Sequence, residues 1–142
     1  MRFGTILADP PWPYEKTSRH EKLSGYSDGK YPSLSIGELA DLPVAEASLP
    51  ESVLLLWTTW PFLPQALFVA NAWGFRYVTA LPWVKADEVV LGAEPAFKPT
   101  YGVGYWMRGA TEPIIVAKRP DAPSVRTSYV GILSTSARHS RK

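Results

Sequence analysis

The chain has 142 residues, a length typical of one domain, and 46% hydrophobic and 20% charged residues, as in ordinary globular proteins. A net charge of +2 is too small to demonstrate a nucleic-acid partner, and the absence of cysteine excludes disulfides, thiolate metal sites and a cysteine nucleophile. No apolar run approaches the ~18 residues of a membrane helix, and the chain opens on a strand-like run rather than a signal peptide. We therefore expect a soluble, cytoplasmic protein that has no membrane partner.

Short apolar runs predict four β-strands, at Phe3–Ala8, Val53–Trp57, Arg76–Lys85 and Glu112–Lys118. The first is expected to be buried, and the unbroken run VLLLW in the second is typical of a strand covered on both faces. Long loops are expected at residues 14–31 and 86–108, which are rich in glycine and polar or aromatic residues.

Helix signals separate these strands. Ser35 and Glu38 have the spacing of a capping box, which predicts a short helix as far as Leu42. A longer helix is expected between residues 58 and 75, with prolines in its first turn and Gly74 at its carboxyl end. The alternation of strands and helices predicts an α/β domain with a largely parallel sheet.

The first strand ends abruptly in the segment DPPW, residues 9–12. Asp-Pro alone is typical of a turn, but ligands of open α/β sheets bind just past the carboxyl ends of strands. The residue types suit methylation of the exocyclic amine of adenine. The Asp9 carboxylate and the Pro10 carbonyl are acceptors for the two amine hydrogens, and Trp12 offers a ring on which an extruded base stacks. Two successive prolines also remove N–H groups that would compete for those acceptors.

The segment ADPPWPYE resembles the motif of the DPPW-type adenine-N-6 methyltransferases, the MT-A70 family. Further segments resemble that family's motifs in the family's order: YPSLSIGELADLPV, LLLWTTWPFLPQAL, AWGFRYVTALPWVK, GVGYWMRGATEPIIVAKR and ARHSRK. The Gly-Tyr-Trp segment is similar to the bacterial and phage branch.

The resemblance implies the catalytic half of a permuted Rossmann-like class I methyltransferase sheet, with S-adenosylmethionine as cofactor and DNA favoured over RNA as substrate. Family members continue past Lys142 into elements that supply most cofactor contacts. We therefore expect residues 1–142 to form the N-terminal catalytic part of a methyltransferase domain. The strand Phe3–Ala8 would then be an exposed edge, open to association with a partner.

The expected catalytic residues are Asp9, Pro10, Pro11 and Trp12. By the resemblance, Asp9 and Lys142 would also contact the cofactor.

The expected substrate-binding residues are Trp12, Tyr105, Trp106, Arg108 and Glu112. Glu112 is included because an acid follows the Gly-Tyr-Trp segment in the family. Aromatic residues interleaved with a basic one suit unpaired nucleic acid. Equally, the aromatic side chains within residues 101–108 could serve to anchor a long loop to the core instead of binding nucleic acid.

Two other functions stay open. Methylation of the cytosine amine is disfavoured, because related enzymes for that base usually open the motif with Ser rather than Asp9. A non-catalytic nucleic-acid-binding or scaffolding subunit is disfavoured because inactive partner subunits of the family lose the DPPW residues. His20 and His139 stand far in sequence from other ligand-type residues, so no metal site is expected.

Overall fold

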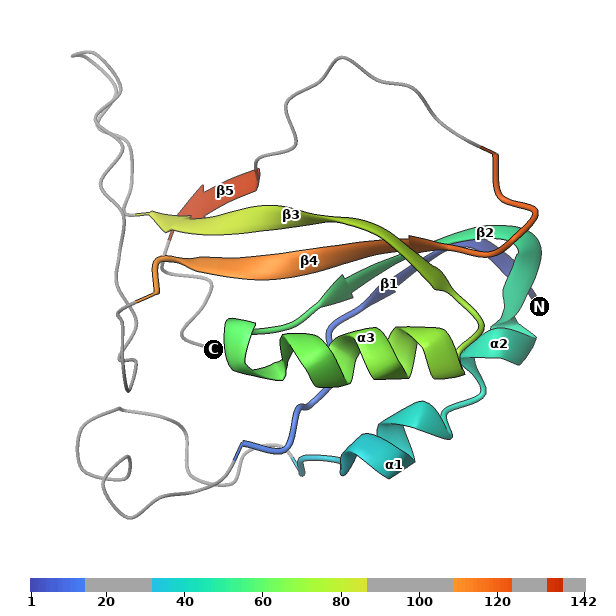
Figure 1. The fold of residues 1–142 in the computed structure, drawn as a ribbon, viewed down its shortest axis with the longest axis horizontal. Coiled ribbons are helices and arrows are strands. Elements are labelled where there is room, and N and C mark those ends of the chain that lie inside the picture. The colour runs from blue at the N-terminus through green and yellow to red at the C-terminus, as the bar shows by residue number, and fades with distance from the viewer. Residues whose placement is uncertain (15–31, 87–108, 124–132, 137–142) are drawn as a thin grey trace.

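The computed structural model describes residues 1–14, 32–86, 109–123 and 133–136 (Figure 1). Its strands are β1 (Phe3–Ala8), β2 (Ser48–Trp57), β3 (Arg76–Ala86), β4 (Thr111–Lys118) and β5 (Leu133–Ser136). Its helices are α1 (Ile36–Ala40), α2 (Val44–Ala47) and α3 (Leu63–Ala72), with a 3-10 turn, η1 (Trp60–Phe62), ahead of α3. The strands expected from the sequence are all present, whereas α2 and β5 were not expected.

The strands form one mixed sheet in the order β1-β2-β4-β3-β5. Parallel pairs join β1 to β2 and β3 to β5, but β4 runs antiparallel to both of its neighbours. The expected α/β class is confirmed, and the expectation of a largely parallel sheet is wrong. The antiparallel β4 brings its first residues to the edge of the sheet where β1 and β2 end.

All the helices in the described part of the chain cover one face of the sheet (Figure 1). Leu54 and Leu56 of β2 are fully buried in a cluster with Val69 and Ala70 of α3. The alternate residues of the same strand are only half-buried. Among the described residues, the helices therefore cover only one of the two faces of β2. None of the described helices is long and apolar enough to cross a membrane.

Strand β1 lies at one end of the strand order and is bonded, within the described residues, to β2 alone. The expectation of an edge strand is thus confirmed for this part of the chain. The expectation of a buried strand is wrong, because Phe3 is 49% and Leu7 is 66% exposed. Only Ile6 and Ala8, on the face that the helices cover, pack against the core.

The capping box opens α1 as the sequence predicted. The Ser35 hydroxyl accepts a bond from the Glu38 backbone N–H, and the Glu38 carboxylate accepts one from the Ser35 backbone N–H. These bonds hold the pKa of Glu38 below its usual range. The helix ends at Ala40, earlier than expected, and its buried Leu39 accepts a hydrogen bond from the Trp73 indole at 2.8 Å. This bond fastens α1 to the carboxyl end of α3.

Gly74 forms the turn between α3 and β3, as the sequence predicted, with a positive φ of 81°. A side chain here would also approach Arg119, since an added Cβ would lie 3.1 Å from Nη2 of that residue. The guanidinium has little freedom to move away, because its Nη1 donates to the backbone carbonyls of Ala45 and Ser48.

We expect Gly74→Ala to destabilise the fold by about 1–2 kcal/mol, because left-handed backbone is costly for a residue with a Cβ. Gly37→Ala is the matched control, since an added Cβ at this helical position meets nothing closer than the Ser35 hydroxyl at 4.0 Å. Chemical denaturation of both variants measures the difference. Equal free energies of unfolding would contradict this account of the turn.

Candidate active site

Asp9 lies directly after β1, where Pro10 and Pro11 end the strand because neither can donate a ladder hydrogen bond. No hydrogen bond or ion pair engages its carboxylate among the residues that the structure describes. Asp9 is exposed as a whole residue, yet burial of its carboxyl group raises the pKa of Asp9, and repulsion by Glu112 raises it further. The carboxylate is therefore a partly desolvated acceptor without a partner in this part of the chain.

The turn that carries Asp9 is anchored by Trp12. Its ring is 4% exposed and lies against Phe62, with ring centroids 5.9 Å apart and planes 20° apart. Its indole N–H donates to the backbone carbonyl of Trp57, at the end of β2, at 3.1 Å. The buried ring with its engaged N–H anchors the turn, and the expected role of Trp12 as a stacking surface for a base stays a prediction.

Backbone bonds complete the turn. The carbonyl of Pro10 accepts from the Trp12 backbone N–H at 2.9 Å, and the carbonyl of Pro11 accepts from Leu34 at 3.1 Å. Because a carbonyl oxygen has two lone pairs, Pro10 keeps one for a further donor. Asp9 and Pro10 thus each keep a free acceptor position in the turn, and their joint role toward an amine stays a prediction.

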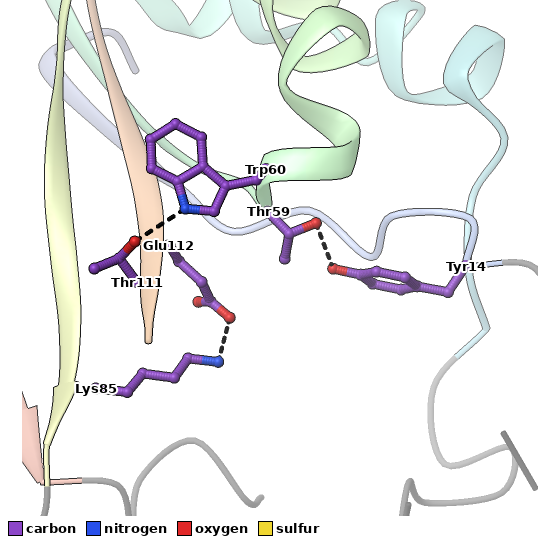
Figure 2. A network of polar contacts seen from close by, with 6 residues as sticks. All are labelled: Tyr14, Thr59, Trp60, Lys85, Thr111 and Glu112. Carbon is purple, nitrogen blue, oxygen red and sulfur yellow. Dashed lines mark hydrogen bonds and ion pairs between the residues drawn. The ribbon is translucent and has the colours of Figure 1, made fainter. Parts of the chain in front are cut away.

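Glu112 reaches this edge from the other direction. Ala8 pairs with Leu56, and Leu56 pairs with Ile115, so the first residues of β4 extend past the end of β1. The Glu112 carboxylate forms an ion pair with Lys85 at 2.5 Å, and both side chains are about one-quarter exposed (Figure 2). Two carboxylates and one ammonium group therefore gather where β1 ends.

Two exposed aromatic residues border the same edge, and the sequence did not single them out. The Trp60 indole donates to the Thr111 hydroxyl at 3.0 Å, and the Tyr14 hydroxyl donates to the Thr59 hydroxyl at 3.1 Å (Figure 2). The available signal was positional: Thr59 and Trp60 follow the predicted strand that ends at Trp57. For Lys85, the signal was its alternation with Trp83 on a strand.

Several expected site residues lie outside the described residues. They are Tyr105, Trp106, Arg108 and Lys142. Their roles in binding substrate or cofactor stay predictions.

The mixed α/β sheet, whose edge strand ends at Asp9, is consistent with a Rossmann-like methyltransferase fold. A family model described as MT-A70 matches residues 3–142, and the chain belongs to the MT-A70 family. Over 140 residues it is 27% identical to the type II methyltransferase M.MunI of Mycoplasma sp. That match covers 88% of this chain and 54% of the relative, so the chain spans about half the relative's length.

Removing the charge of Glu112 and removing the charge of Lys85 should shift the pKa of Asp9 in opposite directions. Glu112 faces it from β4, and Lys85 of β3 neutralises Glu112. We expect Lys85→Met to raise the pKa of Asp9 further, because the Glu112 charge is then unpaired, and Glu112→Gln to lower it. NMR titration of the Asp9 carboxyl carbon measures both shifts, with Lys85→Arg as the control that keeps the charge. Shifts of the same sign in Lys85→Met and Glu112→Gln would contradict the proposed arrangement.

Proposed function

We propose that the protein transfers a methyl group from S-adenosylmethionine to the exocyclic amine of adenine in DNA. The observation that carries the proposal is the pair of acceptors at the end of β1. The Asp9 carboxylate has no partner in the described part of the chain, and the Pro10 carbonyl keeps one lone pair. Membership of the MT-A70 family and the resemblance to a type II methyltransferase support the reaction class.

The amine of adenine needs such acceptors because its lone pair is delocalised into the ring. Hydrogen bonds from the two amine hydrogens to Asp9 and Pro10 favour a tetrahedral nitrogen, whose lone pair then points out of the ring plane. With the cofactor bound, the nitrogen would take the methyl group from the sulfonium, which would leave as a neutral thioether, and the methylated amine would release one proton to solvent. Acceptors fixed in advance lower the barrier without reorganising during the reaction.

The charge of the site fits the cofactor. S-adenosylmethionine supplies an electrophilic methyl group on a positively charged sulfur. Asp9 and Glu112 carry two negative charges against one positive charge on Lys85, which leaves a net negative charge that favours a cation. Asp9 is the described residue proposed to contact the cofactor as well as the amine, and Lys142 is proposed to contact it from outside the described residues.

Trp12 contributes to this function by holding in place the turn that carries Asp9. A desolvated carboxylate near a second one tends to move toward water, and the buried indole prevents this by tying the turn to β2. Pro11 restricts the backbone between them. We therefore propose that Trp12 fixes Asp9 for catalysis. Glu112 is proposed to contact the substrate beside Asp9, while Tyr105, Trp106 and Arg108 are proposed to bind flanking nucleotides.

Replacing Asp9 tests the proposal most simply. We expect Asp9→Asn and Asp9→Ala to lower the methyl-transfer rate roughly 10²–10³-fold, the usual effect of removing one preorganised polar contact. Stability at neutral pH should not fall. Because the folded state raises the pKa of Asp9, it disfavours the charged form, and the neutral variants lose no stabilising charge.

The measurement uses labelled cofactor and three oligonucleotides. In the first only adenine can accept a methyl group on its amine, in the second only cytosine can, and in the third neither can. Asp121→Asn is the matched control, because Asp121 is an exposed acid beyond the far end of β4. A near-normal rate for Asp9→Asn would contradict the role of this carboxylate, and label on cytosine alone would favour the alternative base.

We also expect unpaired or mispaired adenine to be a better substrate than adenine in a stable duplex. A base must leave the stack to reach Asp9, which costs a few kcal/mol and least where pairing is already lost. Comparing rates on matched, mismatched and single-stranded oligonucleotides at one salt concentration measures the preference. A clear preference for the perfect duplex would contradict the view that the free-energy cost of extruding the base limits the reaction.

A further inference from the structure

Trp60 is an exposed tryptophan at the reactive edge of the sheet. It is the first residue of η1 and follows the carboxyl end of β2 after two threonines. Its side chain is 49% exposed, whereas Trp12 and Trp73 are 4% and 2% exposed. Single exposed apolar residues are common, so exposure by itself carries no function.

The ring of Trp60 is nevertheless held in one orientation. Its indole N–H donates to the Thr111 hydroxyl at 3.0 Å, which ties η1 to the first residue of β4 (Figure 2). Pro61 follows in the first turn of η1 and restricts the backbone beside it. Phe68 on α3, by contrast, is 58% exposed and has no polar side-chain atom with which to form such a bond. An exposed ring that is fixed loses little entropy when a flat ligand stacks on it.

Trp60 lies next to the charged groups of the site. Thr111 holds the indole and directly precedes Glu112, which pairs with Lys85 and repels Asp9. Figure 2 shows the Trp60 ring beside Thr111 and Glu112 at the beginning of β4. A base stacked here would therefore lie within the edge of the sheet that carries the acceptors for its amine. Trp12, at 4% exposed, presents far less of its ring.

We infer that Trp60 is the stacking platform for the target nucleobase. This inference rests on the proposed function for the identity of the base, and it names the surface that the base occupies. The π face of the indole can stack on any nucleobase, so selectivity for a base with an amine would come from Asp9 and Pro10. Thr111 is a positioning residue, because it acts on the base only through the indole.

The test measures binding of a single-stranded oligonucleotide in which one adenine is replaced by 2-aminopurine, whose fluorescence falls when it stacks. We expect Trp60→Ala in the full chain to weaken binding about 5- to 150-fold at one fixed salt concentration, the range found when an aromatic platform is removed. The quenching should disappear as well. Trp60→Phe keeps a flat ring and should keep most of both signals.

Two further variants separate stacking from folding. Trp60→Leu keeps apolar bulk without an aromatic face and should behave like Trp60→Ala. Phe68→Ala removes an aromatic side chain that is 58% exposed on α3, and it should bind and quench as the unchanged protein does. Thr111→Val releases the indole and should weaken binding less than Trp60→Leu does. Thermal melting of each variant confirms that it is folded.

Binding and quenching by folded Trp60→Leu that equal those of Phe68→Ala would overturn the inference. That result would leave the proposed function in place if Asp9→Asn still lowered the methylation rate as expected above. Conversely, loss of binding in Trp60→Leu together with no methylation of adenine by the unchanged protein would contradict the proposed reaction and support the platform.

Discussion

The hydrogen bond from the Trp12 indole to the end of β2 is the contact on which the site depends. It joins the segment that follows the edge strand β1 to the buried interior, with Phe62 stacked beneath the ring. Without it, a turn that begins with an acid and two prolines would lose its buried tie to the core, and it would keep more exposed ones such as the backbone bond from Leu34 to Pro11 and the hydroxyl bond from Tyr14 to Thr59. The same tryptophan that ends the motif thus fixes the acid that begins it.

The direction of β4 determines what surrounds that acid. Because β4 is antiparallel to both neighbours, its amino end lies where β1 and β2 end. Thr111 and Glu112, adjacent in sequence, then do two different tasks: one holds the Trp60 indole and the other sets the charge around Asp9. Lys85 from β3 pairs with Glu112 and limits the repulsion. In a sheet with every strand parallel, Thr111 and Glu112 would lie at the opposite edge, away from Asp9 and Lys85.

The sequence predicted the local features well. The capping box at Ser35, the turn at Gly74 and the end of β1 at Asp9 depend on short-range rules, and all are present. Strand direction and burial were harder to predict, because an apolar run does not indicate which way its strand runs or which of its faces is covered. The exposure of Leu7 follows from the edge position of β1, and the burial of Trp12 follows from Phe62 and Trp57, about fifty residues away. For the same reason the sequence did not single out Trp60, and the pairing of Lys85 with Glu112 emerged only once distant strands were placed side by side.

The central claim is that Asp9 and Pro10 form a fixed pair of acceptors for the amine of a base. A crystal structure of the protein with an adenine-containing single strand tests it most directly. We predict that the exocyclic nitrogen lies roughly 2.7–3.2 Å from both an Asp9 carboxylate oxygen and the Pro10 carbonyl oxygen, the usual range for such bonds. An adenine whose amine is bonded elsewhere, with Asp9 turned toward solvent, would contradict the account.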